Sequence, residues 1–342
     1  MKKLFNDGWN FAELSIDYNS MFKDGNPILF SPDKFLNDAQ TQEYKAVRIP
    51  HDWQIHHVSD LYKNSVGFYK KTFTLTEEEI CDRHNAIRFE GVYMNSAVWV
   101  NGKKAGEWKY GYATFEFDIS SLVKAGENEI LVIVVYQNCN TRWYSGAGIF
   151  RDVTYINSSK VHLPTDGVYF TALPADKSKL DGEWNIKITA EVAGALSGQK
   201  IENLITSRDG KVIAKSEFPL SPVPLRDEES DSLHQLVPAL STLSLSRARE
   251  EITIEKPELW DLDNPVFYLL TTRLLDKDEN VIDEQTQHCG FKFAEFTTDE
   301  GFFLNGRHQK IFGACHHHDQ GALGAAFDVN ALRRQFARLK EM

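Results

Sequence analysis

Seven consecutive apolar residues, ILVIVVY at residues 130–136, predict a strand that is buried on both of its faces. The run follows a turn at Gly126, and further upstream Asn101-Gly102 lies between two short runs. Asn-Gly predicts a two-residue hairpin turn, because both central positions need a positive φ. The stretch GYATFEFDI alternates between apolar and polar residues, as a half-buried strand does. Residues 1–161 are therefore predicted to form a two-sheet β-sandwich.

The next segment, residues 162–292, also reads as short strands and turns. WNIKITAEVAG and EEITIEKPELW favour strands, and Asp209-Gly210 favours a turn. Roughly 130 residues of short strands fit an immunoglobulin-like sandwich. Residues 221–249 mix prolines, a charge run and repeated Leu and Ser, which predicts a long loop. A Ser/Leu strand inside that loop stays an alternative.

The last segment, residues 293–342, changes character. A hairpin through Asn305-Gly306 and then a strand are expected in GFFLNGRHQKIFGA, followed by a helix that Asp328 caps. Strand, loop and helix make one unit of a β/α repeat, and a (β/α)8 barrel needs eight. The chain is thus predicted to be mainly β, with three parts: a jelly-roll sandwich at 1–161, an immunoglobulin-like sandwich at 162–292, and the first strand–helix unit of an incomplete TIM barrel at 293–342.

The predicted helix carries an apolar stripe that a single β/α unit cannot bury. We expect this stripe to be exposed, disordered or covered by another copy of the chain. Its members recur at helical spacing: Val329, Leu332, Phe336 and Leu339.

Composition narrows the classes of partner. The 342 residues hold 49 acidic and 38 basic side chains, a formal charge of −11, which argues against a nucleic-acid partner. No apolar run approaches the ~20 residues that span a bilayer, and the two lysines near the start precede no apolar signal region. The four scattered cysteines form no CxxC pair. A cytoplasmic protein without a membrane partner is predicted.

Six motifs in order resemble the N-terminal half of the family 2 glycoside hydrolases, most closely the β-galactosidase-like branch. Any one motif is weak, but their order along the whole chain is specific. The motifs are IPHDWQI, VGFYKKTFTL, the long stretch from FEGVYMNSAVWVNG to ILVIVVY, RWYSGAGIFRDV, KPELWDLDNPVFYLL and GFFLNGRHQKIFGACHHHDQGALG.

The resemblance implies retaining hydrolysis of terminal β-galactosides by two glutamates that lie ~5–5.5 Å apart. In this family both glutamates follow later barrel strands, so they are expected beyond Met342, and this chain alone is expected to be inactive. The implied partner is a carbohydrate in the full-length enzyme, and a homo-oligomer stays open. No cofactor is expected in this chain, although a divalent cation in the rest of the barrel stays open. The alternative function is a free-standing carbohydrate-binding protein.

The cluster HHHD at 316–319 does not have the spacing of a metal site, because three adjacent histidines point in different directions. The resemblance implies that His317, four residues after Gly313, contacts the sugar in the full-length enzyme. His318 and Asp319 continue this candidate site. For Asp319, loop capping or orientation of a histidine is the alternative.

The resemblance also implies substrate contacts from the loop RWYSGAGIFRDV. In several relatives an aspartate binds hydroxyls at the position of Arg142, so either Arg142 pairs with a barrel carboxylate or a shift brings Asn140 into the role. Trp143 offers a flat apolar face for a sugar, and packing between domains is the alternative role for this loop. Asn64 is a further candidate, with a surface turn as its alternative. Asp52 is predicted to be structural, bonded to backbone amides beside a buried Trp.

Overall fold

The computed structural model describes residues 1–24, 26–138, 143–220 and 245–342. These residues group into two compact units. The first unit holds Met1–Asn157 and His316–Met342, and the second holds the described residues between them. This grouping does not test the predicted domain boundaries, which stay a prediction.

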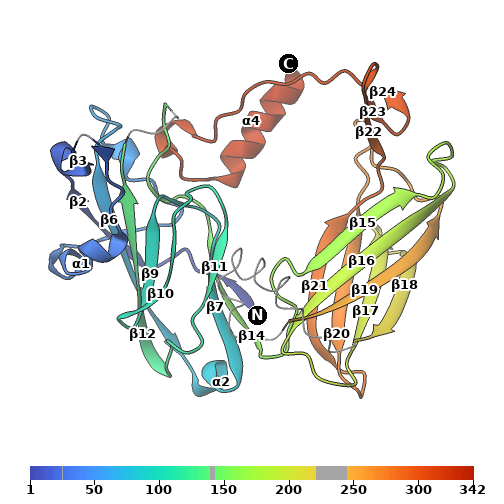
Figure 1. The fold of residues 1–342 in the computed structure, drawn as a ribbon, viewed down its shortest axis with the longest axis horizontal. Helices are drawn as coiled ribbons and strands as arrows, with labels where there is room; N and C mark the ends of the chain where they lie inside the picture. The colour runs from blue at the N-terminus through green and yellow to red at the C-terminus, as the bar shows by residue number, and fades with distance from the viewer. Residues whose placement is uncertain (25, 139–142, 221–244) are drawn as a thin grey trace. The chain divides into compact units, whose positions relative to one another are not determined.

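The first unit is a sandwich of two antiparallel sheets (Figure 1). One sheet has the order β1 (Lys2–Leu4), β14 (Val153–Ser159), β7 (Arg83–Phe89), β11 (Phe115–Asp118). The other has the order β10 (Lys103–Trp108), β9 (Ser96–Val100), β12 (Gly126–Tyr136), β6 (Ser65–Leu75), β2 (Trp9–Ser15), β5 (Lys45–Val47).

Short elements complete this unit. Two small ribbons pair β8 (Val92–Tyr93) with β13 (Gly148–Ile149) and β3 (Phe22–Lys23) with β4 (Asn26–Pro27). The helical turns are η1 (Tyr18–Met21), η2 (Pro32–Phe35), α1 (Asp38–Thr41), η3 (Gln54–His56), α2 (Glu77–Ile80) and η5 (Gly321–Leu323). The hairpin predicted at Asn101-Gly102 joins β9 to β10 with positive φ at both residues, as expected.

Strand β12 lies at the centre of the larger sheet and is buried on both faces, as predicted. Ile130, Val132 and Val134 point into the core between the two sheets. The alternating Leu131 and Ile133 point the other way, into a second cluster closed by Phe30, Phe35 and Ala39. A second sheet therefore covers one face of β12, and the segment around η2 and α1 covers the other.

The second unit contains an antiparallel sandwich of three and four strands, which agrees with the immunoglobulin-like prediction. Its sheets have the orders β15 (Val168–Pro174), β16 (Glu183–Ala193), β19 (Leu245–Glu255) and β18 (Val212–Pro219), β17 (Lys200–Ser207), β20 (Tyr268–Leu275), β21 (Val281–Cys289). Trp184 and Phe291 pack edge to face at its centre, with ring centroids 5.8 Å apart. The loop predicted at 221–249 is corrected at its end, because residues 245–249 pair with β16 as the start of β19. The rest of that loop lies outside the described residues.

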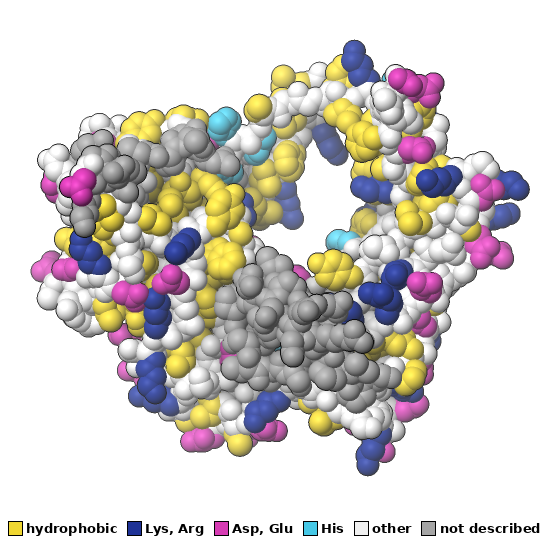
Figure 2. All heavy atoms as spheres, viewed as in Figure 1, with side chains coloured by type: hydrophobic (Ala, Val, Ile, Leu, Met, Phe, Trp, Pro, Cys, Tyr) yellow, Lys and Arg dark blue, Asp and Glu magenta, His cyan; other side chains and the backbone are white. Residues whose placement is uncertain are grey.

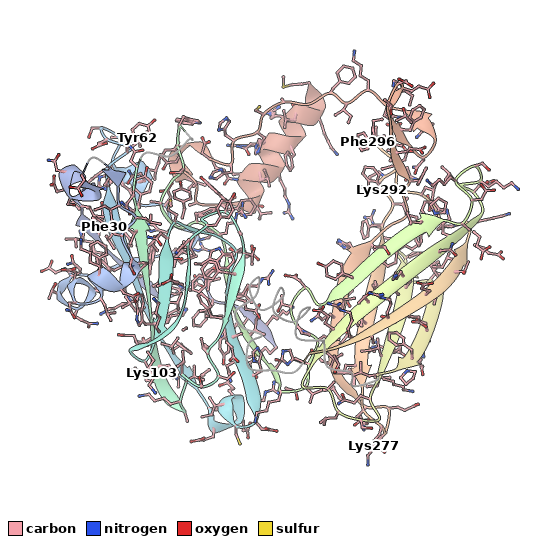
Figure 3. The ribbon with its side chains drawn as sticks, in the orientation of Figure 1. Phe30, Tyr62, Lys103, Lys277, Lys292 and Phe296 are labelled. Atoms are coloured by element: carbon pink, nitrogen blue, oxygen red, sulfur yellow. The ribbon has the colours of Figure 1, made fainter. Side chains whose placement is uncertain are left out.

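The segment predicted to begin a barrel, residues 293–342, forms its predicted elements only in part. Strands β22 (Ala294–Thr297), β23 (Gly301–Leu304) and β24 (Arg307–His308) make a small sheet, with the predicted turn at Asn305-Gly306. Phe296, labelled in Figure 3, is 75% exposed on this sheet. The strand expected after the hairpin is wrong: residues 309–320 form no strand, and Phe312 is 84% exposed. The Gln309 N–H donates to the Phe302 carbonyl oxygen of β23 at 2.9 Å, but beyond it the stretch pairs with no strand among the described residues.

Helix α4 (Val329–Glu341) forms as predicted, and the Asp328 carboxylate accepts from the backbone N–H groups of Asn330 and Ala331. The apolar stripe is largely exposed, as expected, with Phe336 and Leu339 each 49% exposed. The Phe336 ring packs on the ring of His316, at a centroid distance of 5.8 Å.

The surface carries both acidic and basic side chains, as the composition leads one to expect. On the face drawn in Figure 2, acidic and basic side chains are interspersed over the described residues. None of the described helices has the length and apolar character to cross a bilayer.

Candidate functional site

Asp52 is a buried carboxylate that joins three segments of the first unit. Its Oδ1 accepts from the backbone N–H groups of Gln54 at 3.0 Å and Ala147 at 2.9 Å. Its Oδ2 accepts from the Tyr144 hydroxyl at 2.6 Å and from the Ala325 N–H at 2.8 Å. The side chain is only 2% exposed, so these four donors replace the water that burial removes. The structural role predicted for Asp52 is confirmed, and it extends to residue 325.

The approach of the Ala325 segment depends on a glycine. A Cβ on Gly324 would lie 2.3 Å from Asp52 Oδ2 and 2.8 Å from the Tyr144 hydroxyl oxygen. Only a residue without a side chain leaves room for the carboxylate there. The carboxylate also affects its neighbour: burial first, and then the charge of Asp52, raises the pKa of Tyr144, which therefore stays a hydroxyl donor.

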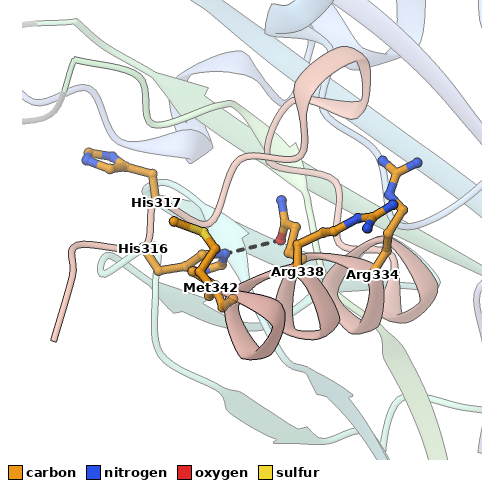
Figure 4. Close-up of a pocket in the computed structure, with 7 residues that line it drawn as sticks. His316, His317, Arg334, Arg338 and Met342 are labelled. Carbon is orange, nitrogen blue, oxygen red and sulfur yellow. Dashed lines mark hydrogen bonds between the residues drawn. The ribbon is translucent and has the colours of Figure 1, made fainter. Parts of the chain in front are cut away.

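The three adjacent histidines contact three different neighbours. His316 turns toward α4, where its Nε2 lies 3.1 Å from Gln335 Oε1, whereas His317 points away from the helix (Figure 4). His318 packs edge to face on Tyr112, with ring centroids 5.3 Å apart. Their divergence agrees with the argument that they do not share one metal ion.

His317 meets the loop that the sequence analysis singled out. The indole N–H of Trp143 donates to His317 Nδ1 at 3.1 Å, and the Trp143 side chain is 54% exposed. The hydroxyl of Tyr62 (labelled in Figure 3) donates to the Trp143 carbonyl oxygen at 2.6 Å. Two candidate residues that are 174 positions apart are therefore in direct contact.

The other candidate residues are not shown in direct contact with Trp143 or His317 among the described residues. Asn64 is 8% exposed, and its Oδ1 accepts from the Asn138 N–H at 2.5 Å, so it supports the chain just before the loop. Asp319 is half-buried, and its charge contributes to the raised pKa of Tyr144. Asn140 and Arg142 lie outside the described residues. The roles of all these residues in substrate binding stay predictions.

Two cavities flank the histidines. One of about 540 Å³ lies between the histidines and α4, lined by His316, His317, Arg334, Gln335, Arg338, Leu339 and Met342 (Figure 4). Another of about 380 Å³ has a lining that includes Phe150, His318, Phe327 and Leu332, together with Glu90. Glu90 is the one acidic residue among the described residues that line either cavity.

The sequence analysis missed Tyr62, Tyr112 and Ala325. Ala325 contributes a backbone N–H, so its side chain carried no signal. Tyr62 and Tyr112 contribute through contacts between loops that are distant along the chain. The one sequence signal for Tyr112 and Tyr62 is their aromatic character within the stretches GYATFEFDI and LYKNSVGFY.

The buried imidazole of His51, next to Asp52 in the sequence, predicts that the stability of the folded chain falls at acidic pH. Burial, and then the charge of the neighbouring His56, lowers its pKa to about 4 from 6.5, while its Nδ1 lies 2.8 Å from the Tyr69 hydroxyl. Between these values the unfolded chain binds a proton that the folded chain does not. The stability contribution of His51 is therefore complete above pH ~6.5 and is lost as the pH falls toward 4, by at most about 1.4 kcal/mol per pH unit.

Urea unfolding at a series of pH values checks this expectation. His51→Gln removes the imidazole, so the difference between wild type and variant isolates its share from that of the carboxylates. Equal slopes for the two proteins between pH 6.5 and 4 would contradict the assignment.

Residues 6–159 match the model of the sugar binding domain of glycosyl hydrolases family 2, and residues 170–292 match a further family 2 model. The chain belongs to glycosyl hydrolase family 2. The resemblance stated from the sequence is thereby confirmed.

Individual family 2 relatives show how much of such a protein this chain represents. It is 29% identical to a β-galactosidase from Bacteroides ovatus over 88% of this chain and 34% of the relative. It is also 29% identical to a β-glucuronidase from Bacteroides fragilis, over 87% of this chain and 42% of the relative. The crystal structure of a family 2 member from Bacteroides cellulosilyticus superposes with a TM-score of 0.78 at 27% identity, covering 99% of this chain and 43% of that one. The chain spans less than half the length of each.

Proposed function

We propose that this chain is the non-catalytic N-terminal part of a retaining family 2 β-glycosidase that acts on terminal β-galactosides. Family membership supports the reaction class. The observation that carries the role of this chain is the contact between Trp143 and His317, which places an exposed aromatic face beside an imidazole. Aromatic faces and imidazole nitrogens are groups that bind sugar rings and hydroxyls.

The acids support a non-catalytic role. A retaining mechanism needs two carboxyl groups ~5–5.5 Å apart. Asp52 accepts hydrogen bonds from four donors, and Glu90 has no acidic companion among the described lining residues of the two cavities. We therefore expect the catalytic glutamates on a part of the enzyme other than these 342 residues, together with any divalent cation, and we assign no cofactor to this chain.

Parallel assays test this proposal. The 342-residue chain and the longest product of its gene are compared on nitrophenyl β-galactoside, β-glucuronide and β-mannoside. We expect the longer product to hydrolyse the galactoside fastest and the 342-residue chain to hydrolyse none. Turnover by the 342-residue chain at an ordinary enzymatic rate, about 1–10³ s⁻¹, would overturn the non-catalytic role. Faster cleavage of the glucuronide would overturn the substrate class, since relatives of both names match this chain.

The alternative is a free-standing carbohydrate-binding protein, which rests on the match of residues 6–159 to a sugar binding domain. Millimolar binding of galactosides by the 342-residue chain, followed by Trp fluorescence, without turnover by any longer product would favour it. We also propose a cytoplasmic location, and self-association through the exposed stripe of α4 in the 342-residue chain. Cell fractionation and sedimentation test these two points.

A further inference from the structure

The two segments that carry Trp143 and His317 both hydrogen-bond to the carboxylate of Asp52. Tyr144 follows Trp143 directly, and its hydroxyl donates to Asp52 Oδ2 at 2.6 Å. The segment that follows His317 returns to the same oxygen through the Ala325 N–H at 2.8 Å. Trp143 and His317 thus lie on two loops whose common attachment is Asp52.

The direction of the Trp143 hydrogen bond determines what His317 can offer. An indole nitrogen donates and never accepts, so the Nδ1 of His317 accepts and carries no proton. A neutral imidazole then holds its proton on Nε2. No hydrogen bond from the described residues reaches Nε2 of His317, and the residue is exposed. His317 therefore presents an N–H donor, which suits a hydroxyl or ring oxygen of a sugar.

We propose that Asp52 is a positioning residue for the sugar site: by holding Tyr144 and Ala325 on one oxygen, it keeps Trp143 against His317 and so keeps Nε2–H of His317 as the donor. The sugar as the ligand of this site rests on the proposed function. The geometry of the site does not depend on that function. Asp52 itself is too deeply buried to touch a sugar. Its effect passes through the two loops, and loss of their register weakens contacts to the ligand.

A minimal variant, Tyr144→Phe, tests the proposal. It removes one hydroxyl and leaves every backbone hydrogen bond to Asp52 in place. The readouts are the solvent exchange of the Trp143 indole proton and the ¹⁵N resonance of His317 Nδ1, both measured by NMR on the 342-residue chain. Trp143→Phe supplies the reference resonance of a His317 ring without its donor, and Asp52→Asn tests the carboxylate directly.

The matched control is Tyr155→Phe, in the same sandwich. Tyr155 is also buried, and its hydroxyl donates to Asn85 Oδ1 away from the loops. A purely structural loss would affect the two Tyr→Phe variants alike. We expect Tyr144→Phe to speed indole exchange by about tenfold or more and to move His317 Nδ1 toward its position in Trp143→Phe, while Tyr155→Phe changes neither.

The proposal is overturned if both resonances stay at their wild-type values in Tyr144→Phe and in a folded Asp52→Asn, or if Tyr155→Phe shifts them equally. These readouts need no sugar, so they remain decisive even when the glycoside assays fail. In the longest active product, Tyr144→Phe should also lower kcat/KM by on the order of tenfold to a hundredfold. An unchanged kcat/KM beside shifted resonances would overturn only the link to the ligand.

Discussion

Replacement of Trp53 by Ala should lower the free energy of unfolding of the first unit by about 3–5 kcal/mol. Trp53 is 1% exposed and stacks on Phe11, with ring centroids 5.4 Å apart. Its indole N–H donates to Ser65 Oγ at 2.9 Å, so truncation leaves a cavity and a buried hydroxyl without that donor. Calorimetry should show a melting temperature lower by roughly 10 °C for this unit.

The matched control is Trp143→Ala, which removes the same side chain from a half-exposed position. We expect it to change the stability by no more than about 0.5 kcal/mol. Hydrogen exchange of the β12 amides assigns the transition to the first unit. A Trp53→Ala variant that unfolds within about 1 kcal/mol of wild type would show that the core does not depend on this indole.

Gly148→Ala should destabilise the same unit by roughly 3–5 kcal/mol, because two costs add. The residue has φ of +134°, a conformation that side chains rarely adopt. A Cβ there would also lie 2.4 Å from the backbone oxygen of His51 and 2.5 Å from the Tyr69 hydroxyl oxygen. The His51 carbonyl belongs to the backbone and cannot rotate away, so the strand pair β8–β13 must distort.

Gly102→Ala separates the two costs. Its φ of +77° is also positive, but no atom lies within 4 Å of the added Cβ. This variant should lose only about 1 kcal/mol, from backbone strain alone. Urea unfolding of both variants measures the difference, and equal losses would contradict the clash at Gly148.

The sequence predicted the strands well where local signals and burial agree. The ILVIVVY run and the Asn-Gly turns at 101 and 305 have one physical solution each, and the structure adopts it. The prediction of a strand failed at residues 309–320, because a strand depends on neighbouring strands that its own residues do not reveal. The cover over the second face of β12, from Phe30 to Ala39, also carried no local signal.

The site could be predicted only as separate pieces. His317 and Trp143 were singled out by a family resemblance, and Asp52 by its place beside a buried Trp. That the three belong to one network depends on the Ala325 N–H, a backbone group that every residue except proline has. Backbone contacts of this kind depend on the path of the whole chain. The identity of the single residue that makes the contact does not reveal it.

The Asp52–Ala325 bond also fixes an order of assembly during translation. Its partners are 273 positions apart, so a ribosome adding about 5–20 residues per second needs roughly 14–55 s to pass from one to the other. Once residue 147 has been added, the nascent sandwich can supply Gln54, Tyr144 and Ala147 to the carboxylate, but not its fourth donor. The Asp52–Ala325 hydrogen bond therefore forms only after the entire intervening unit has been synthesised, and this corner is among the last parts of the first unit to form.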